Sequence, residues 1–249
     1  MKYRFEKEQH IHLLDERPLI GTTTALSVLN KPLTWWASGL AVEALGWYNT
    51  KQKKDENDIG YKARILLGEA NMRKRFAEIK KLSQKDYFKL LQDAYKAHNE
   101  VKKEKADTGI DRHALLEEYV KWCIKENNGN PGWENWKVIS NGDPLWDFVN
   151  WAKDKVKRFL WSELYCYSER LWCGGISDVG WEDKEGNIVL ADFKSSKEAY
   201  FSHWVQAGGY DTQISENGGF TSDGEKIFEL SKPITRYCVV PFGKEVFSP

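Results

Sequence analysis

The chain has 249 residues and a mass of 28.9 kDa, which is enough for one sizeable hydrophobic core and does not require a second domain. Hydrophobic residues make up 41% of it, the mean hydropathy is -0.64, and no apolar run approaches the roughly 18 residues of a membrane span, which excludes a disordered chain and an integral membrane protein. The 37 basic and 37 acidic residues cancel, so net charge alone does not indicate a nucleic-acid-binding protein.

The N-terminal residues predict an extended start. Residues 1–30 are typical of a short strand or arm followed by a turn, and they lack the apolar segment of a signal peptide, which predicts a cytoplasmic protein. His10 and His12 would share one side of such a strand. Because no third ligand is near in sequence, a metal site there is the weaker interpretation.

Helices should dominate the first two thirds of the chain. One should follow Lys31-Pro32, and another should begin at Ser83, a typical N-cap, and end before Asp107-Thr108-Gly109. A third is expected at 110–126, and a fourth should open at Asp143-Pro144 and reach about residue 161. The buried residues of this fourth helix should be Leu145, Phe148, Val149, Ala152, Val156 and Phe159.

Strands should dominate the last third, where the apolar pattern changes to period two. We expect strands at 163–167, 175–181, 188–193 and 234–241. A hairpin loop should lie at 183–187 and a helix at 199–216. The fold class is therefore α/β or α+β, in a single domain over 1–249 whose residues 1–160 are mainly helical and whose residues 161–249 hold the sheet. The cysteines fit no zinc or iron–sulfur spacing, so we expect free, mostly buried thiols at Cys123, Cys166, Cys173 and Cys238.

The region 62–105 is basic, with thirteen Lys and Arg against six Asp and Glu. It therefore carries +7, and the rest of the chain carries -7. A solvated helix face and a face that binds a polyanion both agree with this pattern. If Arg73, Lys74 and Arg75 contact phosphates, salt should weaken binding steeply.

Two acids on the predicted hairpin should oppose each other. If the loop is symmetric about Glu185, Asp178 faces Asp192 with Cβ atoms roughly 5 Å apart, where like charges destabilise a sheet. Lys194 should project from the same face as Asp192, because side chains two residues apart in a strand share a face. The apolar residues around both acids predict burial, and a divalent cation with oxygen ligands would offset the repulsion. A register shift by one residue would separate the acids.

Five segments carry a resemblance to a known family: Gly109-Ile110-Asp111-Arg112-His113 with Glu117 one turn on, Ser162-Glu163, Gly175-Ile176-Ser177-Asp178, Asp192-Phe193-Lys194 and Gln206-Ala207-Gly208-Gly209-Tyr210. In this order they resemble the PD-(D/E)XK nuclease superfamily, and within it the RecB-like exonucleases of bacteria and phages. The stretch from Thr22 to Trp36 is similar to the N-terminal region of phage members. The likeness covers about residues 20–240 and departs from the family in having Asp192 where glutamate is commoner.

The resemblance implies a restriction-endonuclease-like core, that is, a small mixed central sheet flanked by helices, here with a helical N-terminal elaboration. It also implies one or two Mg²⁺ or Mn²⁺ ions. Their ligands would be Asp178, Asp192, His113 and the backbone carbonyl of Phe193. No iron–sulfur cluster is implied, because the cysteines that hold one in some relatives are missing at the required places.

The same resemblance implies roles for the remaining site residues. Lys194 would orient the attacking water and offset charge in the transition state, and Glu163 would be a second acid near the metal or a partner of Lys194. Gln206 and Tyr210, one helical turn apart, would hold the substrate backbone. His113 would otherwise be a core histidine whose partner is Glu117.

The function expected from this resemblance is a metal-dependent deoxyribonuclease, an exonuclease that acts on DNA ends in recombination, repair or phage DNA processing. A structure-selective endonuclease and a catalytically inactive DNA-binding or adaptor protein are the alternatives, and the intact set of Asp178, Asp192 and Lys194 argues against the inactive one. The implied partners are DNA, a recombination or single-strand-annealing protein and, by analogy with ring-forming relatives, further copies of the chain. No membrane partner is expected, and a phage-encoded protein would act in the host cytoplasm.

Overall fold

The computed structural model describes residues 2–29, 34–132, 136, 145–194 and 199–241. Contacts divide the chain into two compact units. The larger comprises Met1–Asn30 and Thr108–Pro249, and the smaller is Lys31–Asp107. The single-domain organisation inferred from length stays a prediction. In the part of the chain that the structure describes, no helix has both the length and the apolar character needed to cross a membrane.

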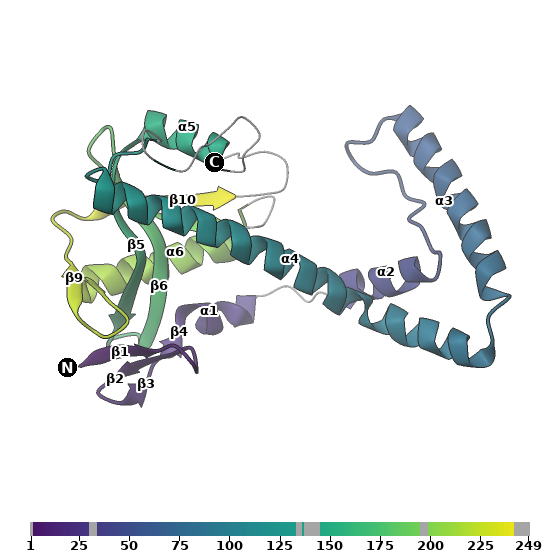
Figure 1. The fold of residues 1–249 in the computed structure, drawn as a ribbon, viewed down its shortest axis with the longest axis horizontal. Helices are drawn as coiled ribbons and strands as arrows, with labels where there is room; N and C mark the ends of the chain where they lie inside the picture. Colours follow the sequence, from purple (N-terminus) through teal and green to yellow (C-terminus); the bar gives the residue numbers. More distant parts are fainter. Residues whose placement is uncertain (1, 30–33, 133–135, 137–144, 195–198, 242–249) are drawn as a thin grey trace. The chain divides into compact units, whose positions relative to one another are not determined.

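A mixed sheet forms the centre of the larger unit (Figure 1). Its strands in spatial order are β10 (Ile234–Pro241), β7 (Ile188–Lys194), β6 (Cys173–Asp183), β5 (Val156–Ser168), β8 (Gly219–Phe220) and β9 (Lys226–Phe228). β10 runs parallel to β7, and the other neighbours in this order are antiparallel. The strands expected in the last third lie within β5, β6, β7 and β10, so the mixed α/β class is confirmed.

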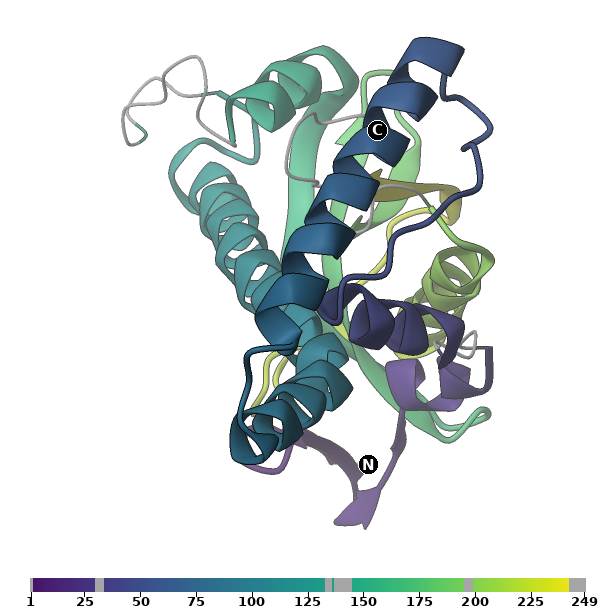
Figure 2. The ribbon, with the colours of Figure 1, turned by 90° about the vertical axis from the view of Figure 1, so that its right-hand side faces the viewer.

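Helices cover both faces of this sheet. They are α4 (Gln84–Glu126, its C-terminal part) and α5 (Trp146–Lys155) on one face and α6 (Phe201–Asn217) on the other (Figure 2). Along β7 the side chains alternate, since Val189, Ala191 and Phe193 pack in the core under α4 and α5, whereas Ile188 and Leu190 pack in the core under α6. This strand is therefore buried on both faces, and a charge on it needs a partner.

The N-terminal arm is a small sheet followed by two short helices. Its elements are β1 (Tyr3–Glu6), β2 (Ile11–Leu14), β3 (Arg17–Pro18), β4 (Ile20–Gly21), α1 (Thr22–Ala25) and the 3₁₀ helix η1 (Leu26–Leu29), with β4 pairing to β6. His12 lies on β2, buried, with its Nδ1 2.6 Å from the hydroxyl of Tyr3, and burial lowers its pKa to about 4. His10 lies in the turn before β2, so the expectation that His10 and His12 share one side of a strand is wrong.

The smaller unit consists of α2 (Thr34–Ala44), α3 (Asp58–Ile79) and the N-terminal part of α4. Of its described side chains, only that of Ala94 is buried. The predicted N-cap of α4 is confirmed, because Ser83 Oγ accepts a hydrogen bond from the backbone N–H of Asp86 at 3.2 Å. Lys31-Pro32, where a helix start was expected, lies outside the described residues, as does Asp143-Pro144.

Two predicted helix ends are wrong. The helix expected to end before Asp107-Thr108-Gly109 continues as α4 to Glu126. One glycine costs a helix interior only about 1 kcal/mol, and no proline lies within α4, so the flanking helix formers outweigh it. The helix expected to reach residue 161 ends at Lys155, and Val156 and Phe159 are buried on β5 instead, since β-branched and aromatic side chains favour the sheet there.

A buried polar group ties α6 to the N-terminal arm. The amide of Gln213 donates to Thr22 Oγ1 at 2.7 Å and to Cys173 Sγ at 3.3 Å, and its oxygen accepts from Cys166 Sγ at 3.2 Å. Thr22 in turn donates to the carbonyl of Gly174 at 3.1 Å. The thiols here are free, as predicted for the four cysteines, of which only Cys238 is partly exposed.

Replacing Gln213 with alanine should lower the free energy of unfolding by about 2–4 kcal/mol, because it leaves a cavity and unpaired buried groups. Urea denaturation followed by circular dichroism measures this change. Ser215→Ala is the matched control, since its hydroxyl lies on the same helix with only an exposed hydrogen bond, and it should change stability by less than about 0.5 kcal/mol. Similar losses in the two variants would contradict the assigned role of Gln213.

Candidate functional site

The β6–β7 hairpin has the predicted register. Val179 pairs with Ala191 and Gly180 with Leu190, which is the symmetric alignment about Glu185. The next two residues outward, Asp178 and Asp192, follow the last backbone pair. Instead of a β6 carbonyl, the side chain of Asp178 accepts the backbone N–H of Phe193 at 2.8 Å. The Asp178 carboxylate therefore lies where the two strands begin to separate.

Asp192 is a buried acid beside the ammonium of Lys194. Only 1% of the residue is exposed, and its Oδ2 lies 2.5 Å from Lys194 Nζ. No described residue gives this oxygen a hydrogen bond of normal geometry. Burial, followed by the charge of Asp178, raises the pKa of Asp192 to about 7, although Lys194 acts in the opposite direction. The single ammonium therefore offsets only part of the cost of the negative charge.

Side chains from α6 continue from this ion pair. Lys194 Nζ donates to Gln206 Oε1 at 3.0 Å, and Gln206 Nε2 donates to the hydroxyl of Tyr210 at 2.8 Å. Gln206 and Tyr210 are both buried. This chain of hydrogen bonds fixes the direction of the Lys194 ammonium, so the lysine is held between Asp192 and α6.

Gly175 makes room for Tyr210. A Cβ atom at this glycine would lie 2.5 Å from Tyr210 Cε1 and 2.7 Å from Thr22 Oγ1, distances that side chains cannot adopt without a shift. The glycine that precedes Asp178 in the sequence motif thus has a packing reason, because it lets α6 approach β6 closely.

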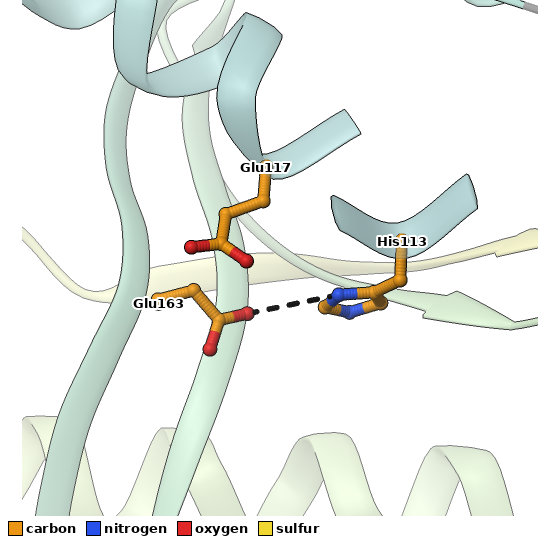
Figure 3. Close-up of side chains that lie close together, drawn as sticks. All are labelled: His113, Glu117 and Glu163. Atoms are coloured by element: carbon orange, nitrogen blue, oxygen red, sulfur yellow. Dashed lines mark ion pairs between the residues drawn. The ribbon is translucent and has the colours of Figure 1, made fainter. Parts of the chain in front are cut away.

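His113, Glu117 and Glu163 form the other half of the site, on the α4 side (Figure 3). Each offers one ligand atom, and these atoms lie within 4.8 Å of one another. His113 Nε2 is 3.2 Å from Asp178 Oδ2, and its Nδ1 is 4.0 Å from Glu163 Oε1. Asp178 raises the pKa of His113 against the effect of burial. Burial, then Asp178 and Glu117, raise the pKa of Glu163 to about 7.

The backbone changes phase at Glu163. Trp161 and Leu164 both pack in the core under α6, although they are three positions apart and strict alternation would put them on opposite faces. Glu163 lies between them with φ of 51°, a left-handed conformation that costs a non-glycine residue about 1–2 kcal/mol. The same turn of the backbone directs the Glu163 carboxylate to His113 on α4 (Figure 3).

Most of the residues selected from the sequence lie together in the larger unit. The members of this group are His113, Glu163, Asp178, Asp192, Phe193, Lys194, Gln206 and Tyr210. The ring of Phe193 packs edge-on against His113 with centroids 5.7 Å apart. Glu117, expected only as the partner of His113, forms an ion pair with Lys121 and belongs to the group that could hold a metal ion. Its position one helical turn after His113 was the available signal.

Arg73, Lys74 and Arg75 lie on α3 in the smaller unit. The side chain of Arg73 is 79% exposed and has a long ion pair of 3.9 Å with Glu69. Arg75 instead donates to the carbonyl of Ala44 at 3.2 Å, which ties α3 to the end of α2. The role of these three residues in binding a polyanion stays a prediction.

The donor atoms of the site suit a hard divalent cation. Four carboxylates and one imidazole converge, and Mg²⁺ and Mn²⁺ prefer such oxygen and nitrogen ligands. Asp192 Oδ2 is buried, has no hydrogen bond of normal geometry from the described residues and lies beside the Lys194 ammonium, so a metal ion would give it a further partner. Asp178 lies within hydrogen-bond range of His113 and next to Asp192. Its carboxylate could therefore be a ligand both of a metal ion held with Asp192 and of a metal ion held with His113.

Comparison of the chain with known protein families, with characterised proteins and with solved structures found no match.

Proposed function

We propose that this protein is a Mg²⁺- or Mn²⁺-dependent deoxyribonuclease with a PD-(D/E)XK-type core, which hydrolyses phosphodiester bonds as an exonuclease at DNA ends. The observation that carries the proposal is the convergence of Asp178, Asp192 and Lys194 at the separation of β6 and β7, with His113 3.2 Å from Asp178. Structural ion pairs are normally compensated, whereas here the buried Asp192 and the partly buried Asp178 and Glu163 share, among the described residues, one ammonium (Lys194) and one imidazole (His113).

A cation would be held by Asp178 and Asp192, with His113 or the backbone carbonyl of Phe193 as a further ligand. His113, Glu117 and Glu163 could hold a second ion. A bound divalent ion lowers the pKa of a water molecule and offsets negative charge on the phosphate. The side chains of these residues would fix the position of the cation, because strands and a helix rather than loops set their own positions.

Lys194 can donate hydrogen bonds to the attacking water and to a phosphate oxygen. Its ammonium carries three donors, of which Gln206 accepts one at 3.0 Å, and it forms an ion pair with Asp192 at 2.5 Å. A donor that the described residues do not engage would orient the attacking water or bind a phosphate oxygen, where charge grows in the transition state. Gln206 and Tyr210 act on the substrate through this lysine, since they hold it in place.

The test is digestion of end-labelled linear DNA and closed circular DNA by the purified protein with Mg²⁺, Mn²⁺ or EDTA. We expect nucleotides to be released from linear DNA with either metal, closed circles to stay intact, and EDTA to stop the reaction. Nicking of the circle would favour the structure-selective endonuclease. Binding without cleavage under every metal condition would favour an adaptor protein and would remove the proposed activity.

A further inference from the structure

The N-terminal turn of α6 carries a histidine close to the candidate site. His203, Gln206 and Tyr210 are spaced by three and four residues, so they share one face of the helix. Gln206 and Tyr210 on this face are buried and connect to Lys194. His203 is the next position of this face toward the start of the helix, and the charge of Lys194 acts on it.

The hydrogen bond of the ring fixes which nitrogen carries the proton. The backbone N–H of Tyr200 donates to His203 Nδ1 at 3.1 Å, and the Tyr200 ring packs edge-on against the imidazole with centroids 5.4 Å apart. Because Nδ1 accepts this bond, the proton of the neutral ring must be on Nε2. Burial and then Lys194 lower the pKa of His203, which keeps the ring neutral.

The Nε2–H donor has no acceptor among the residues that the structure describes, and the residue is partly exposed. A neutral donor fits this place because Lys194 already supplies a positive charge, and a second cation beside it would be repelled. Phosphate oxygens are the acceptors that a polynucleotide presents in greatest number, and neutral side chains commonly bind them.

We propose that His203 is a substrate-binding residue whose Nε2–H donates a hydrogen bond to a non-bridging oxygen of the phosphate next to Lys194 in the bound polynucleotide. This assignment rests on the proposed function and extends the substrate site along α6. It implies that one phosphate of the substrate is held from two sides, by an ammonium from β7 and by an imidazole from α6.

Three substitutions separate this role from a structural one. His203→Gln places an amide N–H near the position of Nε2, whereas His203→Asn places its polar group near Nδ1 and can accept the N–H of Tyr200. We expect His203→Ala and His203→Asn to raise KM for linear DNA about tenfold with kcat changed less than about twofold, and His203→Gln to stay within about threefold of the wild type. If His203 only caps α6, the asparagine variant would be the one that rescues activity.

A chemical change in the substrate tests the contact itself. Fluorescein-labelled oligonucleotides with one methylphosphonate at successive linkages lack one charged oxygen each, and their affinities can be measured by anisotropy with Ca²⁺ in place of Mg²⁺. For the wild type, one linkage should weaken binding about tenfold, and His203→Ala should lose that penalty. The matched control is His10→Ala, which changes a histidine in the turn between β1 and β2 and should keep the affinity penalty.

Equal penalties in the wild type and His203→Ala would overturn the assignment of His203 while leaving the proposed function intact, provided that the wild type cleaves DNA. Absence of both binding and cleavage by the wild type would overturn the two together. The oligonucleotide series therefore distinguishes a wrong contact from a wrong activity.

Discussion

Asp192→Asn should lower Mn²⁺-dependent cleavage of linear DNA by about a thousandfold or more and leave the protein folded. Asparagine keeps the size of the side chain but removes one charged oxygen beside Asp178 and Lys194. Because burial raises the pKa of Asp192, the metal-free protein gains little from this charge, so the variant should melt no lower than the wild type at pH 8. Initial rates on end-labelled DNA and melting followed by circular dichroism measure the two effects.

A control lies on the same hairpin. Glu185, in its loop, has a side chain 71% exposed, and Glu185→Gln should cleave DNA at the wild-type rate. Lys194→Ala should match Asp192→Asn in its loss of activity, since it removes the only described cation within ion-pair distance of Asp192. A tenth or more of the wild-type activity in Asp192→Asn would show that the buried acid is not part of the reaction.

Glu163→Gln should stabilise the metal-free protein at pH 8 and have little effect at pH 5. Burial, followed by the charges of Asp178 and Glu117, raises the pKa of Glu163 from 4.5 to about 7. The folded protein therefore keeps a proton that the unfolded chain releases, and the stability linked to this proton is complete below about pH 4.5 and is lost as the pH rises through about 7. Removing the charge should raise the melting temperature by about 4–8 °C at pH 8. Glutamine retains the strained backbone, so the change isolates the charge.

Added metal should reverse the order of the melting temperatures of the wild type and Glu163→Gln. At pH 8, millimolar Mn²⁺ should raise the melting temperature of the wild type, because it binds the folded state, and should raise that of Glu163→Gln much less. Glu126→Gln, at an acid on α4 whose side chain is 54% exposed, is the control and should respond to Mn²⁺ as the wild type does. Equal metal-induced shifts in the wild type and Glu163→Gln would exclude Glu163 from metal binding.

The residues of the site were largely recognisable from the sequence, because the features that identify them are local. The Asp183–Asn187 loop sets the alignment of Val179 with Ala191, and the nearly continuous apolar run of β7 shows that the strand is buried on both faces. Together these place Asp192 and Lys194 on a buried strand. Spacing within one helix likewise puts Gln206 and Tyr210 on one face.

Long-range packing decided the rest. Nothing local shows that the backbone turns left-handed at Glu163, because that conformation is imposed by Trp161 and Leu164 packing into the same core. Nor does local spacing pair His113 with Asp178 rather than with Glu117, since their approach depends on how α4 lies on the sheet. The helix end predicted at Gly109 is wrong because the helix propensity of one residue is small beside the sum over the whole helix. Chemistry that depends on neighbours along the chain can be recognised in the residues themselves, whereas contacts across the fold follow only from the packed core.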